Sequence, residues 1–297
     1  MNFVAVLAAL IWDRLVPTAR ALREPPWLLA YVRAVLRTVG RARDGRLARA
    51  AGGALLPGLA VLLVCALVRG EGHGTVYLIL ATVVLVFALG PRDLRREVHG
   101  YCAAAFKGDA AAASQLGAEL LGHDAGQRRG PCLESVAEAV FVQANNRLFG
   151  VLFWFAIAGP GGALTFRVTD LLRREAILRA GRADAPAEAQ AVADACQRLH
   201  GYVAFLPARL VAVSYGIAGS FDEAFSGWRS YLANEKDHFF DANDRLLVHA
   251  GRGALGAAWT AAPDEAARAA AALTLTEAAL YVWIVALAVV TLIGWRG

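Results

Sequence analysis

The chain has 297 residues, 58% of them hydrophobic, and a mean hydropathy of +0.46. This composition argues against an ordinary soluble domain and predicts an integral membrane protein, because the apolar residues form blocks near the roughly 17 to 25 residues that a bilayer span needs. The net charge of +5 comes almost wholly from arginine, which is concentrated between residues 14 and 49. Basic residues directly before a span are typical of a cytoplasmic flank, so we expect no nucleic-acid partner.

The sequence contains no recognised cofactor or metal motif. Four cysteines lie far apart and form no C-x-x-C pair, so we expect free thiols rather than a zinc site or a disulfide framework. A phosphate-binding loop, a G-x-S-x-G elbow and an H-E-x-x-H helix are also missing from the sequence. We therefore predict no cofactor and no metal site.

We predict an all-α integral membrane protein with about four to five membrane helices, one of them broken at Gly159–Gly162, plus cytoplasmic amphipathic and alanine-rich helices. The whole chain, 1–297, forms one domain in this prediction. Its parts are N-terminal apolar and basic amphipathic helices (1–50), a helical hairpin (51–90), cytoplasmic helices (91–147), a broken membrane segment (148–172), a helical cytoplasmic or membrane-dipping region (173–277) and a C-terminal span (278–297).

The first 50 residues predict two helices. Residues 1–12 are apolar but lack the basic start of a secretory signal, so we expect a short membrane helix that is retained. After Pro25 and Pro26, residues 27–49 carry apolar side chains at three- and four-residue steps. Such a helix either lies on an anionic membrane surface or packs its apolar face on the protein.

Residues 51–68 and 75–90 predict a membrane hairpin joined by a short glycine-rich loop. Arginines precede the first span and follow the second, so the positive-inside rule places both flanks in the cytoplasm. The helix-prone region that follows brings two carboxylates, Glu134 and Glu138, onto one helix face with Asn145 near its continuation. These groups either hold a cation or polar ligand, or form a plain hydrated face.

The broken segment organises the chain. Its apolar run is interrupted by Gly159-Pro160-Gly161-Gly162, which removes helix propensity and a backbone donor. One hypothesis is a discontinuous membrane helix whose opened backbone lines a polar pocket; the other is a glycine-rich kink or turn between packed helices. Arginines follow at 173, 174, 179 and 182, and a re-entrant segment would return them to the cytoplasmic side.

The region after the break contains another arginine in an apolar stretch, Arg209, directly after Pro207 and Ala208. An arginine at membrane depth needs a partner, and Asp170, Glu134 and Glu138 are candidates. The alternative is a buried helix of a cytoplasmic cap with Arg209 in a structural salt bridge. The last span carries Tyr281, Trp283 and Trp295, as expected for interfacial belts.

Three stretches resemble the AmpE family of inner-membrane proteins, which belongs with the CobD/CbiB cobalamin-biosynthesis proteins in one superfamily. They are ANNRLFGVLFWF at 144–155, GPGGALTFR at 159–167 and LPARL at 206–210. The likeness covers most of the chain. For the enzyme branch, it implies an ATP-using membrane synthase that joins an aminopropanol-type amine to a corrinoid carboxylate.

The chain departs from the enzyme branch where that branch carries carboxylates. Alignment on the phenylalanine run places Val142 and Gln143 at the expected Glu-Asn and Asn146 at the expected aspartate. Alignment on Pro207 places His200 and Gly201 at a pair of aspartates. Because ATP-dependent ligation neutralises phosphate charge through carboxylate-held Mg²⁺, these losses should abolish that chemistry.

The resemblance therefore implies a regulatory protein of the Gram-negative inner membrane, linked to β-lactamase induction, cell-wall recycling and antibiotic resistance. Its partners would be the lipid bilayer, an anionic or amide-rich small ligand, and a protein of the cell-wall signalling pathway. The alternatives are a synthase with a shifted site that uses Glu134, Glu138 and Asn243, and a small-solute transporter. The candidate ligand-binding residues are Glu134, Glu138, Asn145, Asn146, Arg147, Gly159, Pro160, Gly161, Arg167, Asp170, Arg209 and Asn243.

Overall fold

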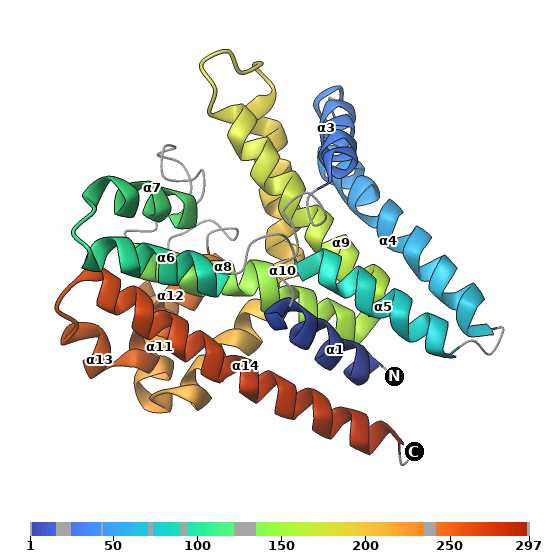
Figure 1. Cartoon of the computed structure of the whole chain (residues 1–297). Coiled ribbons are helices and arrows are strands. Elements are labelled where there is room, and N and C mark those ends of the chain that lie inside the picture. Colours follow the sequence, from blue (N-terminus) through green and yellow to red (C-terminus); the bar gives the residue numbers. More distant parts are fainter. Residues whose placement is uncertain are drawn as a thin grey trace. The chain divides into compact units, whose positions relative to one another are not determined.

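A computed structural model describes residues 2–15, 25–42, 44–70, 74–89, 94–121, 135–234 and 242–295, and these contain helices and no strand (Figure 1). The helices are α1 (Asn2–Leu15), α3 (Pro26–Gly40), α4 (Arg46–Gly70), α5 (Gly74–Leu89), α6 (Leu94–Phe106), α7 (Ala110–Leu121), α8 (Val136–Ala144), the π-helix η2 (Asn145–Phe149), α9 (Gly150–Ala180), α10 (Ala189–Ala218), α11 (Phe221–Asn234), α12 (Ala242–Leu255), α13 (Ala257–Thr260) and α14 (Glu265–Trp295).

The protein is an all-α, multi-pass membrane protein. As far as the described residues show, five stretches are long and apolar enough to cross a bilayer: Arg46–Arg69, Gly74–Phe106, Val136–Ala180, Ala189–Ala218 and Glu265–Ile293. The second of these also runs over residues 90–93, which are outside the described ranges. The predicted fold class is thus confirmed. The outer face of α4 shows why such a chain needs lipid, because leucines 55, 56, 59, 63 and 67 are all exposed.

Helix boundaries differ from the prediction at two places. The predicted helix at 27–49 ends at Gly40, and α4 begins at Arg46 after Gly45, which adopts a positive φ of 71°. Residues 189–218, inside the predicted helical region 173–277, form one helix that continues through Pro207. The predicted C-terminal span, 278–297, is part of a longer helix, α14, that begins at Glu265.

The chain divides into two compact units, each made of two stretches. Unit 1 comprises Met1–Arg92 and Gly150–Val203, and unit 2 comprises Asp93–Phe149 and Ala204–Gly297. The prediction of a single domain stays a prediction.

In unit 1, α4 and α5 pack against each other and both pack against α9 (Figure 1). The apolar face of α3 lies in the same core, where Leu28, Val32 and Leu36 are buried with Val168 and Leu172. The Tyr31 hydroxyl donates to the Gly53 carbonyl at 2.6 Å. Of the two alternatives for the apolar face of this helix, the membrane surface or the protein, the structure therefore shows packing on the protein.

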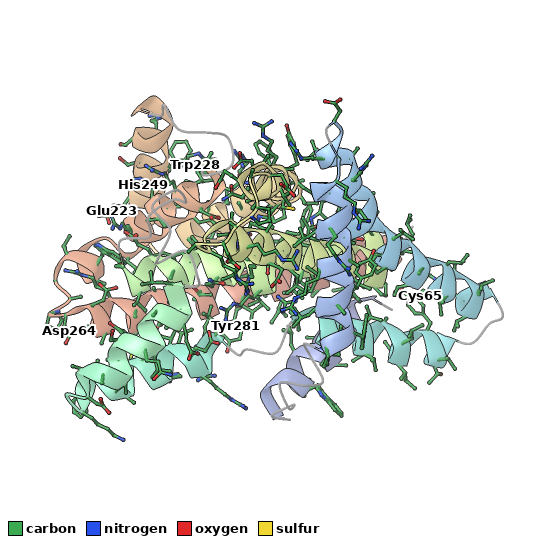
Figure 2. The ribbon with its side chains drawn as sticks, turned by 90° about the horizontal axis from the view of Figure 1, so that it is seen from above. Cys65, Glu223, Trp228, His249, Asp264 and Tyr281 are labelled. Atoms are coloured by element: carbon green, nitrogen blue, oxygen red, sulfur yellow. The ribbon has the colours of Figure 1, made fainter. Side chains whose placement is uncertain are left out.

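In unit 2, α8 and η2 form a central helix. All nine residues of α8 are buried, and its neighbours are α6, α7, α12 and α14. A helix that is buried all round requires every polar side chain on it to find a partner inside the protein or on a ligand. The α11–α12 pair, which carries Glu223, Trp228 and His249, completes this unit (Figure 2).

Candidate functional site

The glycine-rich break reverses the direction of α9. Ala158 and Gly159 leave helical geometry, with Gly159 at φ 64° and ψ −158°, a region essentially reserved for glycine. A Cβ added to Gly150 would lie 2.2 Å from Cζ of Phe166, whereas a straight helix would separate these two positions by about 24 Å. The two halves of α9 therefore fold back on each other. A chain reversal is one part of the predicted re-entrant segment; the return of the following arginines to the cytoplasmic side stays a prediction.

Pro160 and Gly161 each fit the structure of the break for a separate physical reason. Pro160 directly follows the non-helical Gly159, at the start of the second half of α9, where its missing N–H costs nothing. A Cβ on Gly161 would lie 2.4 Å from the Gly58 carbonyl oxygen of α4, so the two backbones cross in direct contact. Ligand contact by Gly159, Pro160 and Gly161 stays a prediction.

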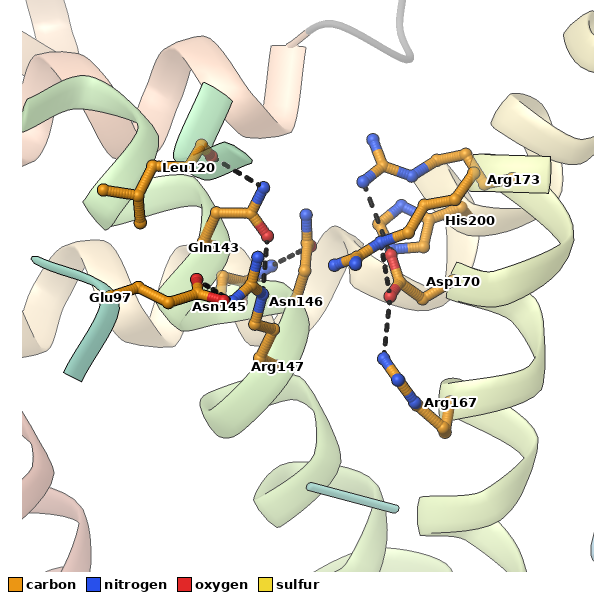
Figure 3. A network of polar contacts seen from close by, with 11 residues as sticks. Glu97, Leu120, Gln143, Asn145, Asn146, Arg147, Arg167, Asp170, Arg173 and His200 are labelled. Carbon is orange, nitrogen blue, oxygen red and sulfur yellow. Dashed lines mark hydrogen bonds and ion pairs between the residues drawn. The ribbon is translucent and has the colours of Figure 1, made fainter. Parts of the chain in front are cut away.

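Unit 1 contains a largely buried group of ionisable side chains just after this reversal, which we call the Asp170 cluster: Arg167, Asp170, Arg173, Arg174 and His200. Figure 3 labels all of these except Arg174. Asp170 is fully buried and Arg167 is 1% exposed. Nitrogens of Arg167, Arg173 and Arg174 lie 3.3, 3.4 and 3.0 Å from the Asp170 carboxylate oxygens. One carboxylate thus gathers three guanidinium groups.

A second helix, α10, contributes His200 to the Asp170 cluster. His200, from α10, places Nε2 4.0 Å from Asp170 Oδ1, and this buried nitrogen has no hydrogen-bond partner in the described part of the chain. Guanidinium groups are the side chains best suited to hydrogen-bond the oxygens of a carboxylate or a phosphate.

A second polar group surrounds the π-helix in unit 2. Arg147 Nη1 donates to Glu97 at 2.7 Å, and Arg147 Nε donates to the Gln143 side-chain oxygen at 2.9 Å. The Gln143 amino group in turn donates to the Leu120 carbonyl at 3.3 Å (Figure 3). This chain of hydrogen bonds ties η2 to α6 and α7 within unit 2.

Asn145 and Asn146, on the same π-helix, are both completely buried. The Asn145 amino group donates to the Asn146 side-chain oxygen at 3.3 Å. The remaining oxygen of Asn145 and the amino group of Asn146 have no partner among the residues that the structure describes. Buried polar atoms without partners are rare, because each loses its hydration without compensation.

Two further ion or hydrogen-bond pairs in unit 2 involve predicted residues. Glu138 is buried and pairs with Arg252, so it does not belong to a hydrated face. Arg209 donates to Asn243 at 2.9 Å, and its guanidinium group lies 3.3 Å from the Phe205 ring centre. The sequence predicted an acidic partner for Arg209, whereas the contact that the structure shows is with the side-chain amide oxygen of Asn243.

The predicted site residues thus fall into groups. Arg167 and Asp170 share the Asp170 cluster, and the glycine-proline residues form the reversal of α9. Glu138, the Asn145–Arg147 run and the Arg209–Asn243 pair lie in unit 2, while Glu134 is outside the described residues. Whether they contact a ligand stays a prediction.

Sequence reasoning did not place several partners in the site: Glu97, Gln143, Arg173, Arg174, His200 and Arg252. Arg173 and Arg174 carried a usable signal, because they lie three and four residues after Asp170 and so share its helix face. Glu97 and Arg252 carried none, since they lie 50 and 114 residues from their partners.

A model of the family described as "Regulatory signalling modulator protein AmpE" matches residues 1–295. The chain belongs to the AmpE family. It is also similar to "Cobalamin biosynthesis protein CobD" of Stutzerimonas stutzeri (strain A1501), at 29% identity over 179 residues, which are 60% of this chain and 56% of that protein. A CobD of Chromobacterium violaceum shows 26% identity over 186 residues, 60% of this chain and 54% of that protein.

The alignments with the curated relatives thus span little more than half of each CobD protein. No solved structure shows a significant match to this AmpE-family chain. The expected relationship to both AmpE and the cobalamin-biosynthesis proteins is confirmed.

Proposed function

We propose that this AmpE-family protein is a regulator in the inner membrane that links cell-wall recycling to β-lactamase induction, and that it responds to a small anionic ligand bound at the Asp170 cluster. The observation that carries the proposal is the convergence of Arg167, Arg173 and Arg174 on one buried carboxylate. The family description supports the regulatory part.

The chemistry of the cluster favours an oxygen-rich anion such as a phosphate or a carboxylate. Guanidinium groups present planar pairs of N–H donors that match these oxygens, and hydrogen bonds between charged groups are about twice as strong as neutral ones. Asp170 holds the arginines in place through ion pairs before any ligand arrives. The ligand would therefore meet donors that are already oriented.

The two helices of the cluster explain how binding could be transmitted. Arg167, Arg173 and Arg174 lie on α9, after its reversal, while His200 lies on α10. An anion that accepts hydrogen bonds from both helices would make the contact between α9 and α10 in unit 1 more stable in the bound state than in the free state. A regulatory signal needs a difference of this kind between the two states. A protein of the cell-wall signalling pathway would read that difference.

The test is β-lactamase induction in a strain that lacks this gene. Complementation with Arg167→Gln and, separately, Arg174→Gln should fail to restore wild-type induction, because each change removes a guanidinium group from the cluster. Arg182→Gln is the matched control, since Arg182 is exposed and lies outside the cluster. Each variant is compared at equal abundance in purified inner membranes.

Two outcomes would overturn the proposal. One is unaltered induction in the deletion strain, and the other is full restoration by both cluster variants at wild-type abundance. Recovery of the protein in outer membranes would refute the inner-membrane location by itself.

The enzymatic alternative is not favoured, because the CobD relatives are only 26 and 29% identical to this chain. We expect no growth when the gene is expressed in a strain that lacks its cobalamin synthase, and growth would reinstate the enzyme hypothesis. A transporter stays a lower-ranked prediction.

A further inference from the structure

The second inference concerns the π-helix of unit 2 and goes beyond the proposed anion site. Residues 145–149 add an extra residue to the helical turn, and such π-bulges occur frequently at functional sites. Here the bulge lies on a helix whose preceding nine residues are all buried. Any polar side chain on the bulge must therefore be satisfied inside the protein or by a bound molecule.

The polar side chains around the bulge divide into two kinds. Gln143 and Arg147 engage each other, Glu97 and the Leu120 carbonyl, as described above, so they fix the position of η2. Asn145 and Asn146 engage each other through a single hydrogen bond. One carbonyl oxygen and one amino group of this pair find no partner in the described residues.

This leftover pair is one acceptor and one donor, both neutral and both completely buried. The result does not depend on how the two side-chain amides are oriented, because reversing both again leaves one oxygen and one amino group. A molecule that satisfies both atoms must offer a hydrogen-bond donor to the oxygen and an acceptor to the amino group. An amide group has both and carries no charge that would need neutralising in a buried site.

We propose that Asn145 and Asn146 form a recognition site for the amide group of a small ligand. Asn145 Oδ1 accepts the ligand N–H, and Asn146 Nδ2 donates to the ligand carbonyl. Gln143, Arg147 and Glu97 are positioning residues that hold the π-helix. The amide group could come from an N-acetylated sugar or from a peptide, and the two sources are separated by the test.

The test uses the full-length protein in phospholipid nanodiscs and ligand-observed saturation-transfer NMR at millimolar probe concentrations. N-acetylglucosamine is compared with glucose, which lacks the amide, and alanylalanine is compared with its ester analogue alanyl-lactate, which lacks the N–H. We expect saturable binding of at least one amide probe and of neither control. Binding of the sugar alone or of the dipeptide alone identifies the source, and either result supports the site.

Variants then locate the binding. Asn146→Leu and Asn145→Leu should each weaken binding of the amide probe at least tenfold. Asn146→Asp is a second variant that preserves size while removing the donor, and it should weaken binding similarly. Thr276→Val is the matched control, because it removes a buried hydroxyl in the same unit, and it should bind like wild type.

The inference is overturned if neither amide probe binds the wild-type protein, if the controls bind as well as the amides, or if folded Asn146→Leu and Asn146→Asp proteins bind like wild type. Circular dichroism and elution volume establish folding. Because binding is measured directly on purified protein, this outcome is independent of the β-lactamase experiment.

Discussion

Gly58→Ala tests whether α4 and α9 depend on direct backbone contact. A Cβ on Gly58 would lie 2.7 Å from the Gly161 carbonyl oxygen and 2.0 Å from the Thr165 hydroxyl oxygen. The hydroxyl can rotate, but the carbonyl belongs to a helix backbone, so the helices must separate by about 0.7 Å to reach ordinary contact. A gap of that size forfeits roughly a quarter to a half of the dispersion energy of each pair it opens.

Overpacking of this kind costs about 1 to 3 kcal/mol, against which alanine regains about 0.8 to 1 kcal/mol of helix propensity over glycine. We expect Gly58→Ala to lower the free energy of unfolding by up to about 2 kcal/mol. Gly52→Ala is the matched control in the same helix, because nothing lies within 4 Å of its added Cβ. That variant should be neutral, or more stable by up to about 1 kcal/mol.

The assay is tryptophan-fluorescence unfolding of both variants in the same detergent, with wild type alongside. Equal stability of the Gly58→Ala and Gly52→Ala proteins would refute the argument, since both substitutions gain the same propensity and only one meets a backbone.

Three further predictions follow from single residues. Gly159→Ala should destabilise the protein by about 1 to 3 kcal/mol in the same assay, because a φ of 64° with ψ −158° is strained for alanine. A Gly159→Ala protein as stable as wild type would exclude this backbone geometry at the reversal. Arg252→Ala should lower the free energy of unfolding by roughly 1.5 to 3 kcal/mol, because it leaves the buried Glu138 carboxylate without this partner. The same substitution in a Glu138→Gln background should cost less, and equal losses in both backgrounds would contradict the pairing. Burial, and then the neighbouring Arg245, lower the pKa of His249 below 6.5. The neutral imidazole is therefore favoured in the folded protein, and its contribution to stability is complete above pH 6.5 and is lost as the pH falls below that value. The free energy of unfolding, measured from pH 8 to 5, should show this loss in wild type and less of it in His249→Gln, and identical pH profiles would count against the argument.

Local sequence signals determined the helices and the main break. Apolar block lengths predicted the membrane hairpin, and the stepwise apolar face of α3 is the face that is buried. Gly159 and Pro160 marked the reversal of α9, because glycine reaches positive φ and proline starts a helix. These features depend on properties of residues that are close together in the chain, so a sequence displays them.

Tertiary structure alone decided which polar groups meet. Glu97 pairs with Arg147 across 50 residues, and Arg252 pairs with Glu138 across 114. Nothing near Asp170 in the sequence indicated that His200 would lie beside it, nor that the oxygen of Asn145 would be buried without a partner. Hydrogen bonds and ion pairs act over a few ångströms in space, and only the packing of distant helices sets those separations.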